Sequence, residues 1–177
     1  MNCFKKLLAG ILVIAVIFNL TSYKAFAEAA SEDSELCVVE GGADSESYTA
    51  SELKYMASII FCEAGNQPYA GKLAVGIVIK NRMESKRFPD SITGVIYQSG
   101  QFTPARNGML KSALSKYSKT GFKSGTAYKQ CLKAAKSALS GKKSVNVGGK
   151  SKSMKGFYFF SRYVSGCKLK IGAHQFK

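Results

Sequence analysis

The segment "LAVGIVI", residues 73–79, most constrains the fold, because it offers no polar face to water. A continuous apolar run of this length is stable only where neighbouring elements bury it on all sides. Periodicity alone allows either a buried strand or a buried helix. Pro68, five residues earlier, is typical of an early helical position. The chain must therefore build a core around this run, and the roughly 130 residues that follow Tyr48 are an ordinary size for one core.

The preceding segment, residues 51–64, has the pattern of an amphipathic helix. Thr49 or Ser51 can cap its N-terminus, and Gly65 can end it. The positions that would face the core follow the i, i+3, i+4, i+7 and i+8 spacing. They are Met56, Ile59, Ile60, Glu63 and Ala64. One carboxyl group therefore lies on or beside an apolar stripe.

Glu63 is one of only three acidic residues between Leu53 and Lys177. It lies in the last turn of the expected helix, where the helix dipole is negative. Desolvation and the dipole both disfavour the carboxylate and so raise the pKa of the group. A carboxyl group that stays partly protonated near neutral pH is what a general acid requires. The alternative is a glutamate that bends to solvent or pairs with one of the many lysines.

The rest of the compact part is expected to be mainly helical. Residues 88–98 are typical of a loop with a short capped helix, and residues 108–118 and 125–140 have helical composition. The aromatic tail, residues 156–176, has Ser165-Gly166 near its middle and predicts a β-hairpin. The fold class is thus α+β: mainly helical, with a small antiparallel sheet or hairpin.

The N-terminal part is expected to precede the folded domain. Residues 1–27 combine two early lysines, an apolar stretch and the small-x-small sequence Ala25-Phe26-Ala27, which indicates a secretory signal peptide. The apolar stretch is shorter than the ~20 residues that span a bilayer, so no stable membrane insertion is expected after cleavage. An uncleaved anchor is the alternative. Residues 28–48 are acidic and favour a flexible leader, which leaves residues 49–177 as the domain.

The segment from Leu53 to Lys177 is strongly basic. It contains 23 Lys and Arg residues against three acids, a net charge of +20. Such a field raises the local concentration of an anionic polymer. A secreted protein meets wall polymers, anionic membrane surfaces and extracellular nucleic acid. No base-reading motif accompanies the charge, so no nucleic-acid partner is expected.

Four cysteines follow the signal peptide, and their state stays open. They are Cys37, Cys62, Cys131 and Cys167. An even number permits two disulfides in a secreted chain, while buried free thiols fit equally well. No C-x-x-C occurs, so neither a metal site nor a cofactor is expected. Cys62 with His174 as its base is a weak nucleophile hypothesis, because the C-terminal end of a helix disfavours a thiolate.

Several motifs, in a fixed order, resemble the spore cortex-lytic enzymes and related SleB/CwlJ-type bacterial cell-wall hydrolases. Glu63-Ala64 is followed by "AGKLAVGIVIKNR", whose Asn81-Arg82 pair belongs to the family pattern. Next come "FPDSITGVIYQSGQFTP", the aromatic "FYFF" and the closing "IGAHQF" with His174. The ordered set covers almost the whole expected domain.

The resemblance implies a lysozyme-like α+β domain that acts on peptidoglycan glycan strands. It implies that residues 73–79 form a buried helix and that Glu63 is the catalytic residue. Members of the family are similar to lytic transglycosylases, which cleave the bond between N-acetylmuramic acid and N-acetylglucosamine without consuming water. One carboxyl group suffices for that reaction, because the sugar's own 6-hydroxyl can act as nucleophile and give a 1,6-anhydro product.

Candidates for substrate contacts come from the same motifs. Gln101 and Thr103 can hydrogen-bond to sugars. The aromatic candidates for stacking on sugar rings are Tyr97, Phe102 and Tyr158. The expected partner is peptidoglycan, in spore cortex or vegetative wall, and the protein is expected to be a secreted monomer.

Two alternatives to a lytic transglycosylase stay open. One is a hydrolysing muramidase-type glycosidase, in which Glu84 or Asp90 would be the second carboxylate. The other is a non-catalytic cationic peptidoglycan-binding module that kept the fold.

Overall fold

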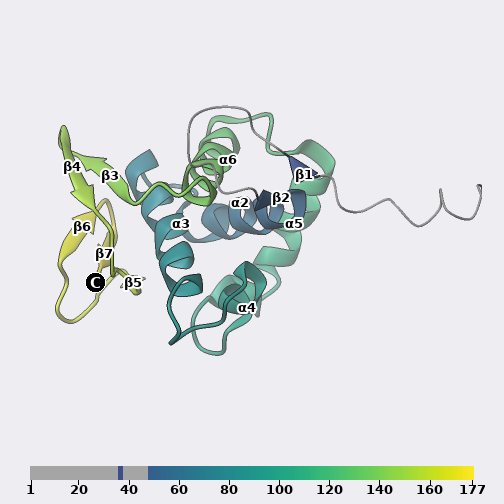
Figure 1. The fold of residues 1–177 in the computed structure, drawn as a ribbon. Coiled ribbons are helices and arrows are strands. Elements are labelled where there is room, and N and C mark those ends of the chain that lie inside the picture. Colours follow the sequence, from purple (N-terminus) through teal and green to yellow (C-terminus); the bar gives the residue numbers. More distant parts are fainter. Residues whose placement is uncertain (1–35, 38–47) are drawn as a thin grey trace, which may run out of the picture. The chain divides into compact units, whose positions relative to one another are not determined.

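The computed structural model describes residues 36–37 and 48–177. The expected signal peptide, residues 1–27, and nearly all of the expected leader lie outside these residues. Figure 1 shows the described part as a group of helices with the C-terminal strands at one side and two short N-terminal strands among the helices. The strands between residues 144 and 176 lie beyond the helix at residues 69–83, on the side opposite the helix at residues 109–120 (Figure 1). The mainly helical α+β class expected from the sequence is confirmed.

Helices are the main secondary structure of the described residues. They are α2 (Ala50–Ala64), α3 (Tyr69–Met83), α4 (Ile92–Tyr97), the 3-10 helix η1 (Thr103–Ala105), α5 (Met109–Thr120) and α6 (Thr126–Leu139). The apolar run at residues 73–79 lies in the middle of α3, so it is a helix, as the resemblance implied. The helices expected at residues 108–118 and 125–140 are confirmed within two residues at each end. No helix in the described part is long and apolar enough to cross a membrane.

Helix α2 begins with a capping box. The Thr49 hydroxyl accepts the backbone N–H of Glu52 at 3.1 Å, and the Glu52 carboxylate accepts the backbone N–H of Thr49 at 2.8 Å. This reciprocal pair satisfies two N–H groups that lack helical partners. At the other end, Gly65 donates its N–H to the Phe61 carbonyl at 3.0 Å. The helix that carries Glu63 therefore has a fixed start and a fixed end.

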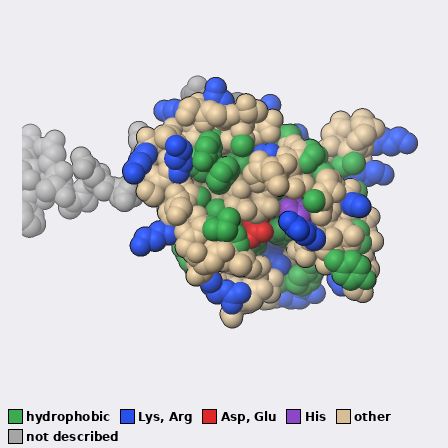
Figure 2. Space-filling view, turned by 180° about the vertical axis from the view of Figure 1, so that it is seen from behind, with side chains coloured by type: hydrophobic (Ala, Val, Ile, Leu, Met, Phe, Trp, Pro, Cys, Tyr) green, Lys and Arg blue, Asp and Glu red, His purple; other side chains and the backbone are tan. Residues whose placement is uncertain are grey.

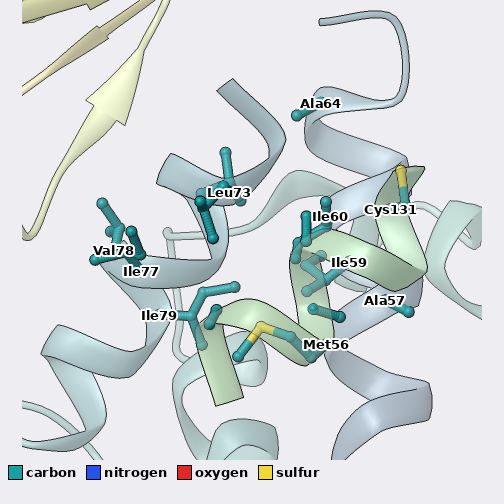
Figure 3. Packing of buried hydrophobic residues seen from close by; sticks show 14 of the residues in the cluster. Met56, Ala57, Ile59, Ile60, Ala64, Leu73, Ile77, Val78, Ile79 and Cys131 are labelled. Atoms are coloured by element: carbon teal, nitrogen blue, oxygen red, sulfur yellow. The ribbon is translucent and has the colours of Figure 1, made fainter. Parts of the chain in front are cut away.

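Helix α3 lies in the core, with α2 and α6 packed against it. The core side chains from these helices belong to one cluster, which Figure 3 shows with Ile59 and Ile60 on α2 and Cys131 on α6. A Cβ on Gly76 would lie 2.9 Å from the Ala138 Cβ and 3.0 Å from the Ile60 Cδ1. The absence of a side chain at residue 76 thus lets the three helices approach closely, and this contact fixes the position of α2.

The strands form three small antiparallel sheets. β1 (Leu36–Cys37) pairs with β2 (Tyr48–Thr49), and β3 (Ser144–Val147) pairs with β4 (Lys150–Ser153). The third sheet contains β5 (Phe160–Ser161), β6 (Leu169–Ile171) and β7 (His174–Phe176), in the order β5-β7-β6.

The topology of the tail differs from the expected hairpin. Strands β5 and β6 do not pair with each other, so the segment around Ser165-Gly166 does not join paired strands. Both strands pair with β7, and the tight turn lies at Gly172-Ala173 between β6 and β7. The expectation of an antiparallel sheet in the tail is confirmed, but the expected position of the turn at Ser165-Gly166 is wrong, because the last strand inserts between the other two.

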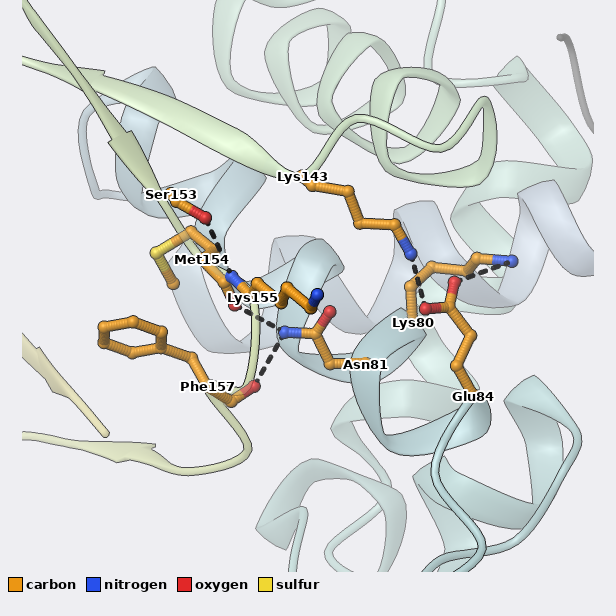
Figure 4. Close-up of polar contacts among 8 residues, drawn as sticks. All are labelled: Lys80, Asn81, Glu84, Lys143, Ser153, Met154, Lys155 and Phe157. Carbon is orange, nitrogen blue, oxygen red and sulfur yellow. Dashed lines mark hydrogen bonds and ion pairs between the residues drawn. The ribbon is translucent and has the colours of Figure 1, made fainter.

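Asn81 and Arg82, at the end of α3, hold the start of this tail. The Asn81 Nδ2 donates to the carbonyls of Met154 and Phe157 at 2.7 and 2.9 Å (Figure 4). The Arg82 Nε donates to the Tyr158 carbonyl at 2.7 Å. The Arg82 guanidinium carbon also lies 5.2 to 5.5 Å from three ring centres, those of Phe88, Phe102 and Phe159. The family pair therefore anchors the segment that leads into β5.

Candidate active site

A polar pocket of about 450 Å³ opens beside the C-terminal end of α2. Three segments far apart in the sequence line it: the end of α2 with its loop, residues 101–103, and the C-terminal sheet. Its lining residues are Cys62, Glu63, Asn66, Gln67, Gln101, Thr103, Phe160, Ser161, Arg162, Ala173 and His174. In Figure 2 an acidic side chain and the histidine lie side by side in a hollow of the surface, with basic side chains near its edge.

Glu63 lies half-buried in the wall of this pocket. Neighbouring core positions on the same face of α2, among them Met56 and Ile60, are fully buried. No hydrogen bond or ion pair joins the Glu63 carboxyl to another described residue. Burial raises the pKa of Glu63 from 4.5 to about 7. The group is therefore close to half protonated at neutral pH, and it can donate a proton and take one back.

No second carboxyl group lines the pocket among the described residues. Glu84 lies at the end of α3, where it forms ion pairs with Lys143 and Lys80 (Figure 4). Asp90 is exposed in the loop before α4. Neither of the two carboxylates considered for assisted hydrolysis is part of the Glu63 pocket.

Gln67 joins the two walls of the pocket. Its Oε1 accepts the backbone N–H of Ala173 at 2.9 Å, and its Nε2 donates to the Asn66 Oδ1 at 2.9 Å. The opposite wall approaches so closely that a Cβ on Gly172 would lie 2.5 Å from the Gln67 Oε1. Gly172 also has a φ of +56°, which disfavours residues with a side chain. The loop after α2 and the β6–β7 turn are thus held together by one carboxamide.

His174 and Arg162 form the far wall. His174 is 9% exposed, and its ring packs near the rings of Phe160 and Phe176, with centroids 5.5 and 6.2 Å away. Burial, together with the charge of Arg162, lowers the pKa of His174. The imidazole is therefore neutral at neutral pH. It adds no positive charge beside Glu63.

A second, larger pocket of about 1070 Å³ adjoins the first. Its walls are mainly apolar and include Phe61, Met109 and Tyr128. Cys62 and Asn66 line both pockets, so the two hollows share one wall. Together they give the Glu63 face a polar half and an apolar half.

The model of the cell wall hydrolase family matches residues 66–176, well over half of the chain. The chain belongs to the cell wall hydrolase family. The family match begins three residues after Glu63, so it covers the far wall of the pocket and not the glutamate itself. The family resemblance expected from the motifs is confirmed.

Individual relatives agree with this family. The chain is 37% identical over 65 residues to a spore cortex-lytic enzyme of Oceanobacillus iheyensis. The aligned stretch covers 37% of this chain and 24% of the relative. It is 31% identical over 84 residues to the Bacillus subtilis spore cortex-lytic enzyme. This aligned stretch covers 48% of this chain and 26% of the relative. The matched stretch thus spans about a quarter of the length of these curated relatives.

Solved structures share the fold. The catalytic domain of the germination-specific lytic transglycosylase SleB from Bacillus anthracis matches with a TM-score of 0.53 and 24% identity. The match covers 78% of this chain and 98% of that domain. The SleB catalytic domain from Bacillus cereus gives the same values. The α+β fold of this cell wall hydrolase is therefore that of the SleB catalytic domain, in line with the lysozyme-like fold that the resemblance implied.

The residues predicted for substrate contacts occupy different environments in the fold. Gln101 and Thr103 are exposed and line the Glu63 pocket. Phe102 is only 2% exposed and lies among Arg82 and other aromatic rings, outside the pocket lining. Tyr97 lies edge-on against Tyr55, and Tyr158 stacks on Phe88; neither lines the pocket. Of the predicted site residues, the structure brings Glu63, Gln101 and Thr103 together in one pocket and leaves the three aromatic residues outside its lining.

Several lining residues were not predicted from the sequence. They are Asn66, Gln67, Phe160, Ser161, Arg162 and Ala173. His174, named from the sequence as a possible base for Cys62 and as part of the closing motif, both packs in the core and lines the pocket. The motif "IGAHQF" carried a signal for this wall, because it places a polar residue among apolar ones in the last strand.

The cysteines take no catalytic part that this geometry supports. Burial, and next the charge of Glu63, raise the pKa of Cys62 to about 11, so its thiol stays protonated at neutral pH. Cys62, Cys131 and Cys167 are free thiols in the structure. Among the described residues, no group of three or more His, Cys, Asp or Glu side chains could hold a metal ion.

Proposed function

We propose that this protein cleaves peptidoglycan glycan strands as a lytic transglycosylase, with Glu63 as its single general acid and base. One observation carries the proposal: a half-buried, unpaired glutamate with a pKa of about 7 lies in an open polar pocket. The absence of a second lining carboxyl group among the described residues favours a reaction that needs only one. Membership of the cell wall hydrolase family and the SleB-like fold support the substrate class.

The reaction divides into two proton transfers at one carboxyl group. Protonated Glu63 first gives its proton to the glycosidic oxygen, the bond from C1 of N-acetylmuramic acid to that oxygen breaks, and the N-acetylglucosamine end leaves as an alcohol. The resulting carboxylate then takes the proton of the 6-hydroxyl while O6 bonds to C1. The product is a 1,6-anhydro sugar, Glu63 is protonated again, and no water is consumed. A pKa near 7 suits both steps, because neither protonation state is strongly disfavoured.

Binding rests on the walls of the pocket and on charge. Gln101 and Thr103 present hydrogen-bonding side chains on one wall, and Arg162 presents a cation on the opposite wall. The net charge of +20 over residues 53–177 favours adsorption to an anionic wall polymer. Secretion by the N-terminal signal and a monomeric state complete the proposal, and the substrate is peptidoglycan of spore cortex or vegetative wall.

The test is digestion of purified peptidoglycan by the protein expressed from residue 28 onward. The measurements are loss of turbidity and mass spectrometry of the released muropeptides. The wild type should release fragments with 1,6-anhydro ends. Glu63→Gln should lose activity by roughly 10²-fold or more, because it keeps the shape of the side chain and removes the proton donor. Glu84→Gln is the matched control, since it neutralises a carboxylate outside the pocket, and it should retain activity.

Other outcomes would select the alternatives. Reducing ends in place of anhydro ends would identify a hydrolysing glycosidase. Binding without any release of fragments would identify a non-catalytic wall-binding module. Near-wild-type release by a folded Glu63→Gln variant would overturn the assignment of Glu63.

A further inference from the structure

Asn66 occupies the wall that the two pockets share. It follows Glu63 by three residues, is exposed, and lines both the polar pocket and the apolar pocket. A ligand that extends from Glu63 into the apolar pocket must pass this side chain. What Asn66 offers to such a ligand depends on the orientation of its carboxamide, because one end donates hydrogen bonds and the other accepts them.

A single backbone group fixes that orientation. The N–H of Ala173 can only donate, so the Gln67 carboxamide must turn its oxygen toward it, at 2.9 Å. The Gln67 Nε2 therefore lies on the other side, where it donates to the Asn66 Oδ1 at 2.9 Å. One acceptor site of the Asn66 oxygen is thus engaged within the protein, whereas no described residue accepts a hydrogen bond from its Nδ2, so the Nδ2 is the better placed group for a ligand.

The backbone of Gln67 is also held in place, which keeps its side-chain carboxamide opposite the Ala173 N–H. Its backbone N–H donates to the Ala64 carbonyl at 2.9 Å, and its own carbonyl accepts a hydrogen bond from the buried Lys72 ammonium. The loop is therefore held to α2, α3 and the β6–β7 turn at once. A flip of the two carboxamides would leave the Ala173 N–H facing a donor.

We propose that Asn66 is the binding site for a 2-acetamido group of the glycan strand. The Asn66 Nδ2 donates to the acetamido carbonyl oxygen, and the methyl group lies on the apolar side of the shared wall. A sugar hydroxyl could bind either end of an asparagine, whereas a carbonyl oxygen requires the donor end that the Gln67 contact presents. An acetamido group also combines a polar and an apolar half, as the wall does. Gln67 is a positioning residue that acts through Asn66. This inference rests on the proposed function, since it assumes an N-acetylated glycan beside Glu63.

The test measures binding in the Glu63→Gln background, so that turnover does not enter. The probe is a peptide-free oligosaccharide prepared from peptidoglycan glycan strands, with its acetamido groups intact. Asn66→Ala should raise the Kd by about 5- to 10-fold, the range for loss of one neutral hydrogen bond. Asn66→Asp should raise it by roughly 20-fold or more, because an acceptor then faces the carbonyl oxygen. Asn146→Asp makes the same change at an exposed position in β3 and should bind like the parent.

Two further arms separate the parts of the proposal. A probe whose acetyl groups are replaced by formyl groups keeps the carbonyl and lacks the methyl, so it should bind less tightly but remain sensitive to Asn66→Asp. Gln67→Met should weaken binding about as much as Asn66→Ala, and the two changes together should add little, because Gln67 acts through Asn66. Circular dichroism and thermal melting establish that each variant is folded.

The proposal is overturned if Asn66→Asp binds the acetylated probe as tightly as Asn146→Asp does. It is also overturned if the effects of Gln67→Met and Asn66→Ala add fully. Failure of the Glu63→Gln parent to bind any glycan would overturn the proposed function together with the acetamido site. The two failures are therefore distinguishable.

Discussion

The ends of helices α2 and α3 carry the same residue in opposite settings. Glu63 lies in the last turn of α2, half-buried and without a hydrogen-bonding or ionic partner among the described residues. Glu84 lies just after α3, exposed, with Lys80 at 3.9 Å and Lys143 in a second ion pair. The negative end of a helix dipole disfavours a carboxylate at either place. Only at the end of α3 do lysines offset it.

The difference shows how this fold raises the pKa of an ordinary glutamate side chain. The protein has 23 basic residues in the segment from Leu53 onward, yet none of them forms an ion pair with Glu63 in the described structure. Lys72, the cation buried nearby in α3, hydrogen-bonds to the Gln67 carbonyl instead. Burial without compensation is what holds the pKa of Glu63 near 7. The site therefore depends on keeping positive charge away from one carboxyl group.

The largest expected effect of the difference between Glu63 and Glu84 is on the pH profile of activity. Because protonated Glu63 starts the reaction, kcat/KM should fall about tenfold for each pH unit above roughly 7, or about 100-fold by pH 9. The measurement is the initial rate of muropeptide release between pH 5 and pH 9. Glu84→Gln should show the same descending limb. A rate that stays level up to pH 9 would contradict a Glu63 general acid with a raised pKa.

The burial of Glu63 should also have a smaller effect on stability, which the Glu63→Gln variant would reveal. The folded-state pKa of Glu63 lies above its unfolded value of 4.5. The contribution of Glu63 to the free energy of unfolding is therefore fully present below about pH 4.5, and it is lost as the pH rises through 7. Above pH 7 the burial of the carboxylate costs up to roughly 3 kcal/mol. Glu63→Gln should escape this loss. Urea unfolding at pH 8 should therefore find it more stable than the wild type, with a gap that closes at pH 4. Equal stability at pH 8 would mean that Glu63 is well solvated.

Glu84→Gln should have the smallest effect. Its ion pairs lie at the surface, where such pairs contribute about 0 to 1 kcal/mol. The free energy of unfolding should change by less than about 1 kcal/mol at pH 7, and the difference should shrink in high salt. Loss of activity in this variant would break the comparison and favour a second catalytic carboxylate.

Local patterns were enough to predict the near wall of the site. Thr49 and Glu52 set the start of α2, and helical periodicity then placed Glu63 beside Met56, Ile59 and Ile60. The rise in the pKa of Glu63 followed from that phase. These inferences depend on residues within about four turns of one another, where sequence spacing determines which side chains share a face.

The far wall could not be predicted in the same way. The contact of Gln67 with Ala173 joins residues 106 positions apart, and no local pattern specifies it. Strand order in the tail has the same difficulty, since β7 enters between β5 and β6 and moves the tight turn to Gly172. Phe102 shows the same difficulty, because aromatic residues that line a groove and those that pack around a buried arginine such as Arg82 have the same sequence signature.

The close approach at Gly172 makes the site sensitive to a single methyl group. A side chain at residue 172 would meet the Gln67 Oε1 at 2.5 Å and the Pro68 Cδ at 3.1 Å, and it would have to adopt a φ of +56°. Either the Gln67 side chain would have to shift and strain its hydrogen bond with Ala173, or the β6–β7 turn would have to move away from the loop that follows Glu63. A mutational survey should accordingly find this position intolerant although it is exposed. The two walls of the pocket can therefore approach this closely only because residue 172 carries a hydrogen atom in place of a side chain.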